Sequence, residues 1–147
     1  MFIYIILALT IFIIDRITKI AALTWWMEHA RYITPFLSCE VVLNRGISWG
    51  MLHSTNDIVF VVVSLIITVI TAMLCWFAYY NYKRGNSILA EVCIITGSVS
   101  NLIDRAIYGG VIDFIILSYG NLSWPVFNVA DMMIVFGVGL LAMRFEK

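Results

Sequence analysis

The sequence predicts an all-α membrane protein, a four-transmembrane-helix bundle with a small β-prone segment on its outer side. Hydrophobic residues make up 63% of the chain and charged residues only 12%, and the mean hydropathy is +0.99, far from the balance of a soluble domain. Four apolar runs are each long enough to cross a hydrocarbon core of ~30 Å at ~1.5 Å per helical residue. A chain of 147 residues suits one domain, so residues 1–147 are taken as a single unit.

The first apolar run, at about residues 2–23, is predicted to be a retained span. It could be mistaken for a cleaved signal sequence, but it lacks a basic leading region and a small-x-small cleavage site. Further spans are predicted at about residues 58–80, 88–107 and 127–145, with a tight basic loop over residues 81–86. Four spans place both termini on the same side of a membrane.

The orientation of the spans follows from lysine and arginine in the short flanking segments. Four such residues fall on the side of the tight loop and the C-terminus, whereas the opposite side holds Arg31 and Arg45 in a longer segment. Both termini are therefore predicted to be cytoplasmic. The four residues are Lys83, Arg84, Arg144 and Lys147.

The outer segment, at about residues 30–53, departs from helical periodicity. Residues 32–37 and 40–43 are short β-prone runs, and Asn44-Arg-Gly46 is a turn signal. This pattern predicts a small sheet that lies on the membrane surface.

Polar residues gather in the outer half of the predicted spans. Asp15 and Lys19 are four residues apart, and Asn128 is three residues from Asp131, so each pair shares one helix face. The third span carries a similar group. An ionisable side chain within a span costs ~3 kcal/mol on insertion scales, which favours one shared polar pocket beneath the outer surface. The third-span group is Asn101, Asp104 and Arg105.

Purely structural roles would explain some of these residues. Asp15 and Lys19 could neutralise each other within one helix, and Asp104 could brace a buried arginine. The asparagines at 101 and 128 could be interhelical hydrogen-bond partners. Asp113 and Asp131 have no basic residue at helical spacing, and they are the candidate catalytic carboxylates.

Several classes of site are not supported. The net charge is zero and the chain has no glycine-rich phosphate loop, so nucleic acid is not an expected partner. The three cysteines have no CxxC spacing, and neither histidine belongs to a cluster, so no metal site and no cofactor are predicted. These residues are Cys39, Cys75, Cys93, His29 and His53.

Four motif blocks together resemble the type II lipoprotein signal peptidases, over the whole chain and in the same order. The resemblance implies an inner-membrane aspartyl endopeptidase of bacteria with four spans and a β-cradle on the periplasmic side. It also implies that the enzyme cuts diacylglyceryl-modified prolipoproteins before the lipidated cysteine, with the active site towards the outer face. The oligomeric state is left open, with a monomer expected. The blocks are Asp15-Arg-Ile-Thr-Lys19, Asn44-Arg-Gly-Ile-Ser-Trp-Gly50, Gly97-Ser-Val-Ser-Asn-Leu-Ile-Asp-Arg105 followed by Gly110-Val-Ile-Asp-Phe114, and Trp124-Pro-Val-Phe-Asn-Val-Ala-Asp131.

By motif position, the resemblance implies that Asp113 and Asp131 are the catalytic pair. Ser100 departs from the family pattern, which usually has glycine before Asn-Leu. Two carboxylates that share one proton can activate water and protonate the leaving nitrogen. The residues implied to line the site are Asn44, Asn101, Arg105 and Asn128.

Other functional classes predict different features. A small transporter would also place carboxylates in its spans, but it should offer a polar route to both faces, whereas the inner half here is almost wholly apolar apart from Glu91. A non-enzymatic scaffold would need no uncompensated aspartates. A serine protease would need a nucleophile motif near a histidine, which the chain lacks.

Overall fold

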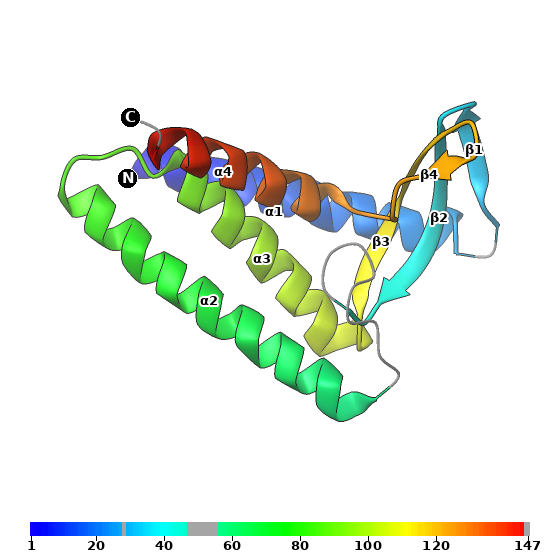
Figure 1. Cartoon of the computed structure of the whole chain (residues 1–147), viewed down its shortest axis with the longest axis horizontal. Helices are drawn as coiled ribbons and strands as arrows, with labels where there is room; N and C mark the ends of the chain where they lie inside the picture. Colours follow the sequence, from blue (N-terminus) through cyan, green and yellow to red (C-terminus); the bar gives the residue numbers. More distant parts are fainter. Residues whose placement is uncertain (28, 47–55, 146–147) are drawn as a thin grey trace.

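The computed structural model describes residues 1–27, 29–46 and 56–145. The helices lie together, with the sheet at one end of the bundle and both termini at the other (Figure 1). Within the described residues the elements are α1 (Phe2–Trp25), β1 (Arg31–Thr34), β2 (Leu37–Asn44), α2 (Asp57–Lys83), α3 (Leu89–Tyr108), β3 (Val111–Tyr119), β4 (Leu122–Ser123) and α4 (Val129–Phe145).

The helices match the predicted apolar runs to within about three residues at each end, because local capping decides where they stop. Asn56 precedes α2, and its side-chain oxygen accepts a hydrogen bond from Ile58 N at 2.8 Å. Gly109 follows α3 with φ of 69°, the left-handed conformation that ends many helices. α3 is central and contacts each of the other three helices.

The strands form one antiparallel sheet in the order β1-β2-β3-β4. The predicted β-prone run at residues 32–37 is interrupted, because a turn separates β1 from β2. Thr34 Oγ1 accepts hydrogen bonds from Phe36 N at 3.3 Å and Leu37 N at 3.0 Å, and Pro35 between them has no N–H to donate to a neighbouring strand. Residues 47–53 of the predicted segment lie outside the described residues.

Residues 111–123, for which the sequence predicts no helix or strand, form β3 and β4. β3 pairs with β2 over nearly its whole length, with Val42 opposite Asp113 and Asn44 opposite Val111. This pairing joins segments about 70 residues apart, and it carries the sheet into contact with the helices.

A small apolar core packs the sheet against the C-terminal end of α1. Ala22, Ile112 and Phe114 are buried together, and the ring of Trp26 lies 6.0 Å from that of Phe114. β3 therefore has a fixed position relative to the helices.

Two glycines allow α3 and α4 to pack closely. A Cβ atom at Gly97 would lie 2.6 Å from the carbonyl oxygen of Ala130, and one at Gly137 would lie 2.7 Å from that of Ala90. Both distances are too short for a side chain. The first turn of α4 is thereby held against α3 near Gly97.

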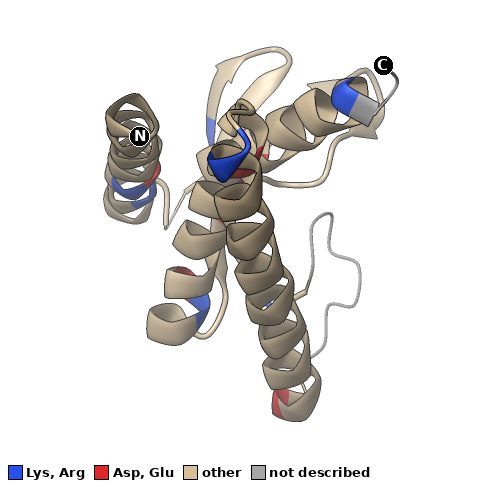
Figure 2. Cartoon of the chain, turned by 90° about the vertical axis from the view of Figure 1, so that its left-hand side faces the viewer, with Lys and Arg blue, Asp and Glu red and all other residues tan. Residues whose placement is uncertain are grey.

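By length and composition, α2 is the one described helix that is long and apolar enough to cross a membrane. α4 has 17 residues, and α1 and α3 carry charged residues within their apolar runs. The predicted count of four spans is therefore not confirmed by this measure and stays a prediction. Most of the length of the helices nevertheless consists of residues other than lysine, arginine, aspartate and glutamate (Figure 2).

Candidate active site

Asp113 reaches the site from β3, in a stretch where four consecutive residues are buried. Its own exposed fraction is 2%. Asn44, at the end of β2, donates from Nδ2 to Asp113 Oδ2 at 2.9 Å. The sheet thus positions the carboxylate of Asp113 and its hydrogen-bond partner, the amide of Asn44.

Asp131 reaches the site from the first turn of α4. Asn128 directly precedes the helix, and its Oδ1 accepts from Asp131 N at 2.9 Å, while Asp131 Oδ2 accepts from Asn128 N at 3.2 Å. This reciprocal pattern is a capping box in which Asp131 occupies the third helical position. The motif that begins the helix also fixes the carboxylate.

The segment before α4 is tied to β3, which brings the two aspartates together. Phe127 and Ile115 form an isolated bridge, with Ile115 N donating to Phe127 O at 2.8 Å and Phe127 N to Ile115 O at 3.1 Å. Asn128 therefore lies beside Asp113, and its Nδ2 donates to Asp113 Oδ1 at 2.6 Å. One asparagine contacts both carboxylates.

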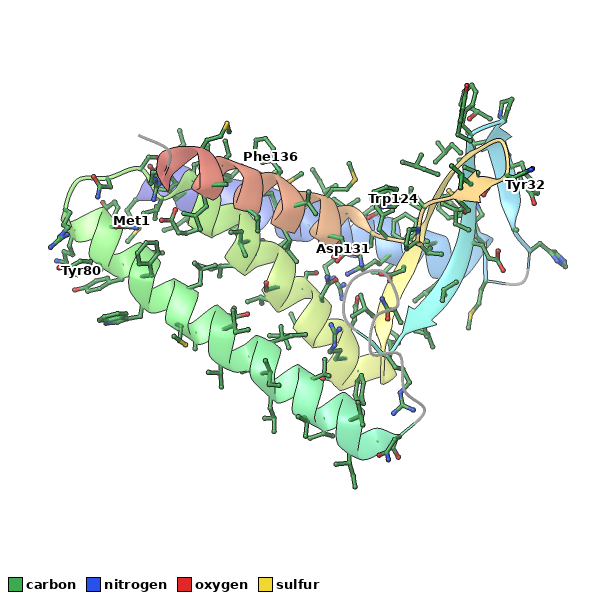
Figure 3. All side chains as sticks on the ribbon, viewed as in Figure 1. Met1, Tyr32, Tyr80, Trp124, Asp131 and Phe136 are labelled. Atoms are coloured by element: carbon green, nitrogen blue, oxygen red, sulfur yellow. The ribbon has the colours of Figure 1, made fainter. Side chains whose placement is uncertain are left out.

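The aspartates open onto a cavity of about 150 Å³, at the sheet end of the bundle where Asp131 is labelled (Figure 3). The cavity is polar on the side of the aspartates and apolar where α2 and α4 contribute isoleucine. Asn101, Arg105 and Asn44 share the polar side with the two aspartates, whereas Asn128 supports them from a fully buried position. The remaining lining residues are Ile67, Ser98, Val111 and Ile134.

The environment of Asp113 favours a protonated carboxyl group. Burial raises the pKa of Asp113 to about 7, and the negative charge of Asp131 adds to this effect. Hydrogen bonds from Asn44 and Asn128 and the charge of Lys19 act in the opposite direction. A group with this pKa can hold or release a proton near neutral pH.

Near Asp131, a cluster of ion pairs joins α1 to α3 through Asp15, Arg16, Lys19 and Asp104. Lys19 Nζ contacts Asp15 at 2.9 Å and Asp104 at 2.7 Å, so the pair at 15 and 19 is not merely intrahelical. Arg16 contacts the same two carboxylates, at 3.3 Å and 2.7 Å. Asp104 therefore pairs with two residues of α1, and the arginine that it contacts is Arg16.

Arg105 lies 8% exposed at the cavity wall and donates to the carbonyl oxygen of Gly46 at 2.6 Å. Asn101 donates from Nδ2 to Asp131 Oδ1 at 2.8 Å. Among the described residues, no group of three or more histidine, cysteine or acidic side chains is arranged to hold a metal ion.

Two contacts of Asp15 were not expected from the sequence. Its Oδ2 accepts from Ser100 Oγ at 2.6 Å and its Oδ1 from Ala130 N at 2.8 Å, so α1 also holds the first turn of α4. The role of Arg16 was missed as well. Arg16 lies within the first motif block, but the carboxylate nearest to its guanidinium group is that of Asp104, which is 88 residues away in the sequence, on α3.

Comparison with known proteins identifies the family. Residues 7–146 match the family described as Signal peptidase (SPase) II. The chain is 36% identical over 138 residues to the lipoprotein signal peptidase of Thermodesulfovibrio yellowstonii, covering 93% of this chain and 90% of that protein. It is 33% identical over 143 residues to the lipoprotein signal peptidase of Aquifex aeolicus, covering 97% and 84%.

The fold is also that of a solved protein. A bacterial membrane enzyme determined by the in meso method at 2.3 Å resolution superposes with a TM-score of 0.79 and 26% identity, covering 99% of this chain and 88% of that one. The resemblance noted in the sequence motifs is thus confirmed, and the chain belongs to the signal peptidase II family.

Proposed function

We propose that this protein is a membrane aspartyl endopeptidase that removes the signal peptide from diacylglyceryl-modified prolipoproteins, cutting before the lipidated cysteine. Family membership supports action on prolipoproteins. The observation that carries the aspartyl mechanism is the convergence of Asp113 and Asp131 on Asn128 at the wall of one cavity.

The charges around the cavity favour one proton on the aspartate pair. Asp15, Arg16, Lys19 and Asp104 together carry no net charge, so among the described residues that line the cavity Arg105 is the cation that balances the pair. With one proton shared, the pair and Arg105 sum to zero, which a low-dielectric site favours. One carboxylate can then take a proton from water while the other gives one to the leaving nitrogen.

The polar side chains around the pair suit a peptide substrate. Asn44 and Asn101 each hold a carboxylate through one amide hydrogen, and both also line the cavity. Arg105 presents a fixed positive charge at the same wall, where it can stabilise the oxygen of a tetrahedral intermediate. No covalent intermediate is needed.

Exposed apolar surface supports placement in a bacterial inner membrane with several spans. α2 leaves Ile58, Met73 and Trp76 between 65% and 73% exposed, which suits contact with lipid and not with water. The lysine and arginine bias supports an orientation with both termini in the cytoplasm and the cavity near the outer surface.

An apolar groove beside Asp131 suits the acyl chains of the substrate. Its volume is about 420 Å³, and it runs from Trp124 near the sheet along α4 to Phe136 (Figure 3). The groove is formed by β3, by the segment that precedes α4 and by α4 itself. Its lining is Leu117, Trp124, Phe127, Asp131, Met132, Val135 and Phe136.

Processing of a lipidated precursor by the purified protein tests the proposal. In detergent micelles, a diacylated prolipoprotein should be converted to two products, with mass spectrometry placing the new N-terminus at the lipidated cysteine. Intact precursor after prolonged incubation would contradict a peptidase. Proton or solute flux from liposomes, without cleavage, would instead support a transporter.

A further inference from the structure

Lys19 makes a contact that charge balance does not require. Its side chain is 1% exposed, and besides Asp15 and Asp104 its Nζ donates to Asn101 Oδ1 at 2.8 Å. Both carboxylates already contact Arg16. The bond to the neutral amide gives the third N–H of the buried ammonium an acceptor, and it also acts on the orientation of Asn101.

That bond fixes which way the Asn101 amide points. A lysine ammonium has three donors and no acceptor, so it must face the amide oxygen. The NH₂ group of Asn101 is then turned to the opposite side, where it donates to Asp131 Oδ1 at 2.8 Å. A flipped amide would set its oxygen against the carboxylate, with two acceptors facing each other.

A second donor to the same oxygen is weaker. Asn128 Nδ2 lies 3.3 Å from Asn101 Oδ1, but the same NH₂ group makes the much shorter bond of 2.6 Å to Asp113. A charged donor at 2.8 Å forms roughly twice as strong a hydrogen bond as a neutral one. Lys19 is thus the main determinant of the amide orientation.

We propose that Lys19 is a positioning residue for the aspartate pair, acting through Asn101 to keep the Asp131 carboxylate in its catalytic orientation. This proposal rests on the peptidase function proposed above. Asn101 and Asp131 both line the cavity, whereas Lys19 is not among the described residues that line it. Its effect on catalysis is therefore indirect.

Arg16 provides a matched control, because it pairs with the same two carboxylates but makes no hydrogen bond to Asn101 among the described contacts. Lys19→Met and Arg16→Met each remove one positive charge from the same cluster. Lys19→Met should lower kcat at least about tenfold with KM within about threefold, as expected for a misplaced catalytic group. Arg16→Met should leave kcat within about threefold.

The pH dependence of kcat distinguishes a positioning role from partial unfolding, because a smaller amount of folded protein would lower kcat without shifting the pH profile. The charged groups near the pair are Lys19 and Asp15 from α1, Asp104 and Arg105 from α3, and the aspartates themselves. Burial, as the largest influence, raises the pKa of Asp113, and Lys19 opposes it. Lys19→Met should therefore move the whole profile to higher pH, further than Arg16→Met does.

A double-mutant cycle tests the route through Asn101. In an Asn101→Ala background, Lys19→Met should lower kcat less than about threefold further, because the amide that it orients is already gone. If the tenfold loss is undiminished there, or if Arg16→Met costs as much as Lys19→Met, the positioning role is wrong. The wild-type protein must process precursor in the same assay, and its failure to do so would instead contradict the peptidase function.

If Lys19→Met does not fold, two double variants that leave the charge cluster neutral replace the comparison of Lys19→Met with Arg16→Met. Lys19→Met with Asp104→Asn, and Arg16→Met with Asp104→Asn, both leave one positive and one negative charge in the cluster. The first should again have the lower kcat by about tenfold. Equal kcat values for the two would overturn the proposal.

Discussion

Asn128 and Asp131 hydrogen-bond to each other in both directions, through Asn128 Oδ1 to Asp131 N at 2.9 Å and Asp131 Oδ2 to Asn128 N at 3.2 Å. A pattern that usually only starts a helix here also presents a half-buried carboxylate to a cavity. Because both backbone amides remain in place when the side-chain acid is replaced, the helix should survive loss of the catalytic proton.

Asp113→Asn and Asp131→Asn should each remove nearly all turnover while the protein still folds. An amide can neither take nor give the proton that general acid–base catalysis requires, a contribution of about 100-fold or more. Initial rates on a diacylated precursor, with thermal unfolding measured in the same detergent, check both points. If either variant keeps more than about a tenth of the wild-type rate, the assignment of the pair fails.

Activity should fall as pH rises through about 7, the pKa to which burial, aided by Asp131, raises Asp113. The proton needed by the leaving nitrogen is present below this pH and lost above it. The hydrogen bond from Asn44 lowers this pKa, so Asn44→Leu should move the alkaline limb to higher pH. Profiles of kcat/KM measure the shift.

Glu40→Gln is the matched control for Asn44→Leu, because Glu40 lies on the same strand but is exposed. Its alkaline limb should coincide with that of the wild type. A limb that moves to lower pH in Asn44→Leu would contradict the stated environment of Asp113.

Gly97→Ala should reduce both stability and activity. The new Cβ would lie 2.6 Å from the carbonyl oxygen of Ala130, next to Asp131, so the first turn of α4 must move. Overpacking of this kind costs about 1–3 kcal/mol. Gly139→Ala, on α4 itself, meets nothing within 4 Å and should be tolerated. Similar melting temperatures and rates for the two variants would show that the close packing at Gly97 is unimportant.

Reporter fusions test the orientation in the membrane. Fusions after Lys147 and within residues 81–86 should report the cytoplasm, and fusions within residues 30–53 and near Asn121 should report the outside. A reversed pattern would place the cavity on the wrong face for exported lipoproteins.

The diacylglyceryl group should dominate substrate recognition. Each buried methylene contributes ~0.8 kcal/mol to confinement at the membrane, and acyl chains in the groove along α4 would lie next to Asp131. An unlipidated precursor should be cut at least ~100-fold more slowly, equivalent to roughly 2.7 kcal/mol in kcat/KM. Equal kcat/KM in the same micelles would refute this recognition while leaving the aspartyl mechanism standing.

Phe136→Ala should narrow the difference between lipidated and unlipidated precursors, because Phe136 lines the groove. Phe2→Ala removes an equally large exposed ring at the other end of the bundle and should leave the difference unchanged. Comparison of these two variants distinguishes recognition of the acyl chains by the groove from a general effect of losing an exposed apolar ring that contacts detergent.

Helix positions could be predicted from the sequence because each helix coincides with one apolar run. β3 could not, since Val111–Tyr119 is largely apolar without a clear alternation and is a strand only through pairing with β2. Its partner lies about 70 residues earlier, and periodicity carries no information on such a distant contact.

The site was predictable where spacing within one helix decides it. The contact of Lys19 with Asp15 follows from helical geometry, whereas Asn128 lies just before α4 and contacts Asp131, three residues on, through a capping box. The bonds of Asp15 to Ser100 and Ala130 depend on how α1, α3 and α4 pack, which spacing along the chain does not specify.

The ion cluster behind Asp131 also bears on how the chain enters a membrane during synthesis. Lys19 can neutralise Asp15 one turn away, but Arg16 keeps an uncompensated charge until Asp104 arrives 88 residues later. An isolated arginine within a span opposes insertion by about 2.5–3.5 kcal/mol. If α1 spans the membrane as proposed, the carboxylate that balances Arg16 comes from α3, so pairing of the two helices would favour both insertion of α1 and assembly of the site.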